Sequence, residues 1–112
     1  MEKAFKQLHL GDMEHGLAKT IAVLALEPSE VSLRTGLTFE TTRDDLDYLQ
    51  AVLFQTNDGG QFALVRHQHS PASGTDLLVN ERTIDLGGAL EMALSALKIA
   101  SAELKWIHPE IR

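Results

Sequence analysis

Residues 48–69 read YLQAVLFQTNDGGQFALVRHQH, and this stretch decides the fold class. Residues 57–60, Asn-Asp-Gly-Gly, are a strong turn signal because glycine, asparagine and aspartate tolerate a positive φ. Side chains that favour strands lie on both sides of this turn, and two such runs around a short turn predict a β-hairpin. A helical interpretation of residues 48–56 stays open, because leucines recur there at helical spacing.

Further strands are predicted on both sides of this hairpin. Apolar and polar residues alternate over residues 31–40, which predicts a strand with one buried face. A polar turn is predicted at residues 41–45, and a short apolar strand over residues 75–80. The strands carry apolar residues on both faces, so we expect the second face to be covered by another element or another subunit.

Two helices are expected to flank these strands. Apolar residues at helical spacing predict one helix over residues 13–26, with Asp12 as its N-cap and Pro28 ending it. Residues 2–8 predict a short helix or an irregular lead-in. A second, longer helix is predicted from an N-cap at Asp85 to about residue 107.

The predicted C-terminal helix has two apolar sides. One side carries leucines, and on the other Met92, Ile99 and Trp106 recur every seven residues. A helix with two apolar sides must bury both, so the second side packs either on the first helix or on a second copy of the chain. In the homodimer interpretation these three residues form the interface.

The expected architecture is therefore α+β in a single domain over residues 1–112. It is an antiparallel β-meander of about four strands, flanked by an N-terminal helix and a long C-terminal helix in the order α-β-β-β-β-α. The hydrophobic fraction of 44% and the charged fraction of 23% are typical of a globular protein.

Composition excludes several function classes. The chain has no cysteine, which excludes a disulfide scaffold, a thiolate metal site and a cysteine nucleophile, and fits a reducing cytoplasm. The first residues lack the features of a signal peptide, and the longest apolar run is too short to cross a bilayer. The net charge of −6 argues against DNA, RNA and anionic membranes as partners, since these are bound through Lys and Arg.

The candidate ligand-binding residues cluster at the end of the second hairpin strand: Arg66, His67, His69 and Ser70. Residues two apart on a strand point to the same face, so the two histidines can present two imidazoles together. The alternative is a polar strand end that faces solvent. No third metal ligand has a recognisable spacing; Asp58 and Asp76 qualify only if the fold brings them near.

We therefore expect no metal and no cofactor. No nucleophile motif and no phosphate-binding loop is present, which favours a non-catalytic protein-interaction or ligand-binding module that acts as a homo-oligomer. The alternative is a small enzyme or metal-dependent protein that uses His67 and His69.

Overall fold

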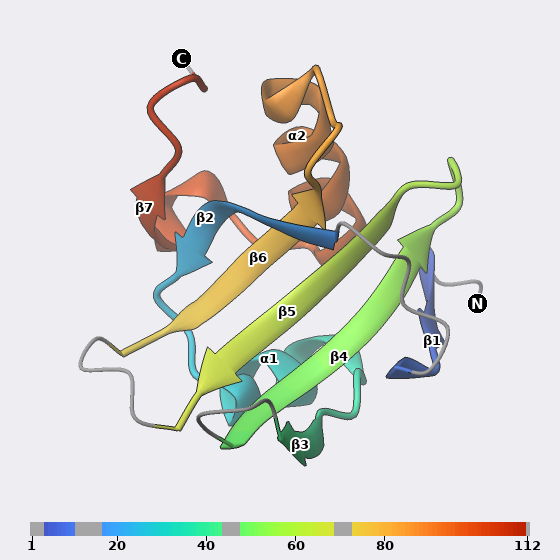
Figure 1. The fold of residues 1–112 in the computed structure, drawn as a ribbon, viewed down its shortest axis with the longest axis vertical. Coiled ribbons are helices and arrows are strands. Elements are labelled where there is room, and N and C mark those ends of the chain that lie inside the picture. The colour runs from blue at the N-terminus through green and yellow to red at the C-terminus, as the bar shows by residue number, and fades with distance from the viewer. Residues whose placement is uncertain (1–3, 11–16, 44–47, 69–72, 112) are drawn as a thin grey trace.

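The computed structural model of this chain describes residues 4–10, 17–43, 48–68 and 73–111. This part of the chain forms a seven-stranded antiparallel sheet and two α-helices (Figure 1). The elements are β1 Phe5–Leu8, β2 Leu17–Leu24, α1 Pro28–Thr35, β3 Glu40–Arg43, β4 Tyr48–Thr56, β5 Gln61–His67, β6 Thr75–Asn80, α2 Leu86–Leu97, the 3-10 turn η2 Ser101–Glu103 and β7 Leu104–Ile107.

The strand order across the sheet is β1-β4-β5-β6-β2-β7, and β3 also pairs with β4. β1 pairs with residues 53–56 of β4 and β3 with residues 48–51, so these two short strands share one edge of the sheet. β7 pairs with β2 and forms the other edge.

The predicted hairpin is confirmed. β4 and β5 pair from Leu49 opposite His67 to Gln55 opposite Gln61, which rules out the helical alternative for residues 48–56. Gly59 in the turn has a φ of +90°, a conformation that glycine adopts without a steric penalty. The strand over residues 75–80 and the N-cap at Asp85, whose side chain accepts a hydrogen bond from Gly88 N, are also confirmed.

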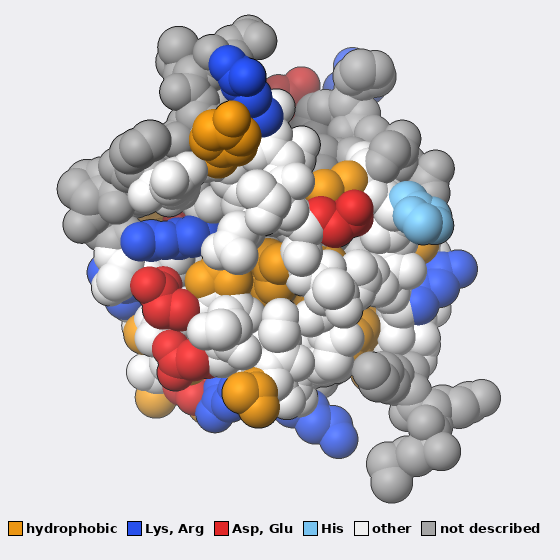
Figure 2. Space-filling view, turned by 90° about the horizontal axis from the view of Figure 1, so that it is seen from below, with side chains coloured by type: hydrophobic (Ala, Val, Ile, Leu, Met, Phe, Trp, Pro, Cys, Tyr) orange, Lys and Arg blue, Asp and Glu red, His pale blue; other side chains and the backbone are white. Residues whose placement is uncertain are grey.

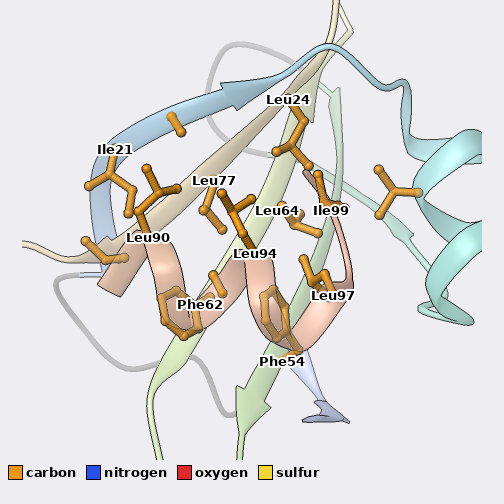
Figure 3. Close-up of a cluster of buried hydrophobic side chains, with 14 of the residues drawn as sticks. Ile21, Leu24, Phe54, Phe62, Leu64, Leu77, Leu90, Leu94, Leu97 and Ile99 are labelled. Carbon is orange, nitrogen blue, oxygen red and sulfur yellow. The ribbon is translucent and has the colours of Figure 1, made fainter. Parts of the chain in front are cut away.

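Both helices pack on one face of the sheet (Figure 1). The main core forms there, and Figure 3 shows leucines of α2 lying over aromatic and aliphatic side chains of β4, β5 and β6. The opposite face carries a smaller buried cluster of Ala51, Leu53, Ala63 and Val65, against which Leu8 and Leu10 pack. Apolar residues on both faces of β4 and β5 thus reflect two separate cores.

The predicted fold class is wrong in its element count and order. The order is β-β-α-β-β-β-β-α-β, so the first helix follows the second strand, and the sheet has seven strands where about four were expected. β4, β5 and β6 do form a meander, but β2 inserts between β6 and β7. β1 forms within the predicted helix or irregular lead-in over residues 2–8, and β3 overlaps the predicted turn at residues 41–45. Three further segments account for the rest of the difference.

The helix predicted over residues 13–26 is replaced by strand β2 in the described residues. Opposite Thr20 and Ala22, β6 advances by one residue only, so Ile21 forms a β-bulge. Ile21 and its neighbour Ala22 are consequently both fully buried in the main core. Because the bulge interrupts the alternation of buried and exposed residues along the strand, the apolar residues of β2 recur at a spacing that resembles that of a helix. Asp12 and Met13, at the predicted start of that helix, lie outside the described residues.

The strand predicted over residues 31–40 is helix α1 and its C-terminal extension. Pro28 at the first turn, a hydrogen bond from Glu27 N to Glu30 Oε1 at 3.1 Å, and a left-handed Gly36 after the last turn define its ends. Val31 and Thr35 are buried, whereas Leu33 is 86% exposed. One helical face therefore explains the burial, and the apparent alternation is coincidental.

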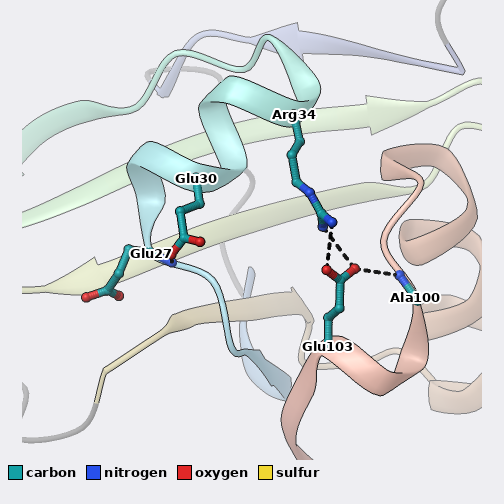
Figure 4. A network of polar contacts seen from close by, with 5 residues as sticks. All are labelled: Glu27, Glu30, Arg34, Ala100 and Glu103. Atoms are coloured by element: carbon teal, nitrogen blue, oxygen red, sulfur yellow. Dashed lines mark hydrogen bonds and ion pairs between the residues drawn. The ribbon is translucent and has the colours of Figure 1, made fainter.

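The C-terminal helix ends at Leu97, ten residues before the predicted end. Lys98 adopts a left-handed conformation with φ 58° and ψ 44°, and its N–H bonds to carbonyls of the last turn. Glu103 of η2 then pairs with Arg34 of α1 at 2.7 Å and accepts a hydrogen bond from Ala100 N (Figure 4). The chain can then leave the helix axis and place β7 beside β2.

Candidate functional site

The candidate site is a small cavity of about 170 Å³ on the sheet face opposite the helices. Residues of four strands and of the segment before β6 line it: Val23, Val65, Arg66, His67, Ser73, Gly74, Asp76, Lys105 and Trp106. We call it the Trp106 pocket.

The strand register brings the central residues of the pocket into one row. Val65 of β5 lies opposite Asp76 of β6, Asp76 opposite Val23 of β2, and Val23 opposite Trp106 of β7. Directly opposed residues of antiparallel strands share a face of the sheet. The row therefore sets one carboxyl group between two valines, with an indole ring at the outer end.

The Asp76 carboxyl is half-buried by these neighbours. Burial raises its pKa above the ordinary value of 3.8, because desolvation disfavours the charged form, and the nearby His67 and Arg66 oppose that rise. A carboxyl with a raised pKa beside a histidine in a hollow is a recurring feature of functional sites.

Hydrogen bonds hold the rim of the pocket in place. Lys105 Nζ donates to the Ser73 carbonyl at 2.9 Å, and Arg66 Nη1 lies 3.4 Å from the Gly74 carbonyl. Gly74 N donates to Glu27 Oε2 at 2.8 Å. Gly74 has a φ of +110°, and a Cβ there would strike the Leu24 carbonyl oxygen. Only glycine therefore fits this part of the rim without rearrangement.

The structure brings three of the predicted site residues together. Arg66 and His67, expected to bind a ligand, and Trp106, expected at an interface, line the same pocket. His69 and Ser70 lie outside the described residues. Met92 and Ile99 lie elsewhere: Ile99 is buried in the main core, and the Met92 sulfur is 3.3 Å from Thr56 Oγ1. Since α2 ends at Leu97, Met92, Ile99 and Trp106 do not share a helix face.

Asp76 was a candidate only if the fold brought it near His67 and His69, and the fold does place it beside His67 in the pocket. Asp58, the other carboxylate considered, lies at the β4–β5 turn instead. Lys105 was not singled out, because residues up to about 107 were predicted to continue the C-terminal helix. No local signal reveals it, since its role depends on the β-structure of residues 104–107.

A larger hollow of about 430 Å³ lies between the β4–β5 turn and the start of α2, where Met92 and Asp85 line it. The only titratable side chain there is that of Asp85, and its Oδ1 already accepts the 2.9 Å bond from Gly88 N that caps α2. This hollow therefore brings together no group of charged or titratable side chains comparable to that of the Trp106 pocket.

Two further findings concern ligand class. Within the described ranges, no group of three or more His, Asp or Glu side chains is arranged to hold a metal ion. On the face seen in Figure 2, described Lys and Arg side chains are interspersed with Asp and Glu and do not gather into one basic patch.

No helix in the described part of the chain is long and apolar enough to cross a membrane. Comparison with protein-family models, curated proteins and solved structures finds no match to this chain.

Proposed function

We propose that this protein is a non-catalytic protein-interaction module that acts as a homo-oligomer. The observation that carries the proposal is the Trp106 pocket beside an exposed tryptophan. Its volume of about 170 Å³ is below the roughly 300–1,000 Å³ of sites for drug-sized ligands and cofactors. The pocket suits a single inserted side chain better than a whole cofactor, which favours a protein as the occupant.

The residue types support an interface. Trp106 remains 43% exposed although it is the only tryptophan of the chain, and tryptophan and arginine are enriched among the residues that dominate binding energy. Arg66 and Trp106 both line this pocket. The pocket is lined by polar groups of Arg66, His67, Lys105 and Asp76 and by the apolar side chains of Val23 and Val65. Apolar contacts with polar groups around them are typical of protein interfaces.

The remaining parts of the proposal rest on charge and composition. A net charge of −6 with interspersed basic residues supports a protein partner over nucleic acid. The absence of cysteine supports the cytoplasm as the place of action.

Size-exclusion chromatography with light scattering tests the proposal. We expect a mass near twice the chain mass of 12.3 kDa, and a shift towards monomer in Trp106→Ala. Leu33→Ala is the matched control, because Leu33 is an exposed apolar residue on α1, away from the pocket. A wild-type protein of single-chain mass at every concentration tested contradicts homo-oligomer formation.

A second candidate function is a small enzyme or metal-dependent protein that uses His67 and His69. The observation in its favour is the electrostatic coupling of His67 with the half-buried Asp76. Zinc content after incubation with zinc and removal of the excess tests the metal version. This version predicts stoichiometric zinc that is lost in His67→Ala with His69→Ala; a wild-type protein without bound zinc argues against it.

A further inference from the structure

We propose that a second copy of this chain pairs with the outer edge of β7 in antiparallel orientation, about a two-fold axis at Trp106. This inference rests on the proposed homo-oligomer and names its interface. Two sheets joined in this way form one continuous sheet, with the two Trp106 side chains adjacent on the face that carries the Trp106 pocket.

The backbone of β7 leaves hydrogen-bonding groups free on its outer side. Among the described strands, β2 alone pairs with β7. His108 N donates to Ile21 O at 2.9 Å, on the β2 side. Successive amides of an extended strand point to alternate sides, so the N–H of Ile107 points away from β2. An edge with outward-pointing amides and carbonyls is a template for another strand.

The two edges of the sheet differ in their exposed side chains. β3, on the opposite edge, has four exposed residues and a charge at each end, Glu40 and Arg43, and β1 carries the exposed Lys6. Charged residues on short strands are a common protection against edge pairing. β7 instead exposes Trp106 and Ile107, by 43% and 40%. Its only charged side chain is that of Lys105, whose Nζ donates a hydrogen bond to the Ser73 carbonyl.

Symmetry favours a second copy of the chain as the partner of β7. Pairing of β7 with the protected opposite edge would join copies head-to-tail into an open-ended assembly. Pairing of β7 with β7 instead gives a closed two-fold dimer. A two-fold antiparallel pair places the residue on the axis opposite its own copy. With the axis at Trp106, the outward Ile107 N–H faces Lys105 of the other copy, and apolar side chains meet at the centre.

Charge also favours this edge as the contact between two acidic chains. Copies with a net charge of −6 repel each other in general. β7 contains no acid, and the adjacent Glu103 is already neutralised by Arg34 at 2.7 Å. The repulsion is thus lower at this edge than at an edge that carries an unpaired acid.

Disulfide trapping tests the pairing cleanly, because the chain has no cysteine of its own. Trp106 lies at a non-hydrogen-bonded position of the proposed pair, where Cα atoms are about 4.5 Å apart, within the range that a disulfide spans. Oxidation captures pairs that form only transiently, so Trp106→Cys at high protein concentration should give a covalent dimer of twice the mass, although loss of the indole weakens the pair. Ile84→Cys, at a position that is 97% exposed and outside β7, is the control and should form little covalent dimer under the same oxidation.

A second variant keeps the test independent of the tryptophan side chain. Ile107→Pro removes the outward N–H and should halve the mass in light scattering, while far-ultraviolet circular dichroism stays unchanged. A dimeric wild type whose Ile107→Pro variant is also dimeric overturns the β7 pairing and leaves the proposed function standing. A monomeric wild type overturns both.

Discussion

At the scale of single residues, the side chain of Gln61 is a clear target. Its Oε1 is buried and has no hydrogen-bond partner among the residues that the structure describes, and a buried acceptor left unsatisfied costs about 1–3 kcal/mol. We expect Gln61→Met, which keeps a similar length without the polar atom, to raise the free energy of unfolding by about 1 kcal/mol. Urea denaturation measures the change. Gln55→Met, at the position directly opposite in β4, is the control and should give no such gain.

Asp76 gives a pH prediction at the same scale. Its folded pKa lies above the ordinary value of 3.8, so the folded protein keeps the proton to a higher pH than the unfolded chain does. The stability that this group contributes is complete below that ordinary value and declines as the pH rises through the folded pKa.

Asp76→Asn stays neutral and should not show this decline. The difference in unfolding free energy between Asp76→Asn and the wild type should therefore shift in favour of the variant as the pH rises. Glu103, whose pKa is lowered by Arg34, has the opposite pH dependence but is present in both proteins. Thermal unfolding across pH measures the difference; an equal pH profile for both proteins would refute the role of burial. Asp58→Asn, at the exposed turn, controls for loss of one acid.

At the scale of elements, the start of β6 depends on Gly74. Its φ of +110° and its approach to the Leu24 carbonyl leave no room for a side chain. We expect Gly74→Ala to lower the free energy of unfolding by about 2 kcal/mol or more. Gly59→Ala is the matched control: φ is +90° but no atom lies within 4 Å of the added Cβ, so about 1 kcal/mol of conformational strain is expected. Similar losses at both positions would contradict the close contact at Gly74.

The end of α2 supplies a stabilising prediction. Lys98 is the only non-glycine residue with a positive φ in the described part of the chain, and this conformation costs about 1–2 kcal/mol for a residue with a Cβ. Lys98→Gly should therefore stabilise the protein by about 1 kcal/mol in urea denaturation. Lys98→Ala keeps the Cβ and should not, which separates the backbone effect from the loss of charge.

At the scale of the whole molecule, net charge governs association. Two chains of −6 repel each other, and salt screens such repulsion. If the dimer forms through the apolar edge of β7, added sodium chloride should lower its dissociation constant, which sedimentation velocity measures. A dissociation constant that rises with salt would indicate an interface held by opposite charges instead.

The sequence by itself determined the local features of this protein. The hairpin of β4 and β5 followed from the Asn-Asp-Gly-Gly turn, because turn chemistry acts within a few residues. The N-cap at Asp85 followed for the same reason. Arg66, His67 and Trp106 were singled out from their types and positions, but nothing local indicated that they line one pocket.

Only the tertiary structure decided the rest. β2 is a strand because it pairs with β6 and β7, whose residues lie more than 50 positions further along the chain, and its bulge at Ile21 disguises the strand period. Residues 104–107 form β7 for the same reason, although their spacing continues the pattern of α2. The Trp106 pocket exists only where these strands meet β5 and β6. Partners so distant in sequence contribute free energy that no local pattern contains.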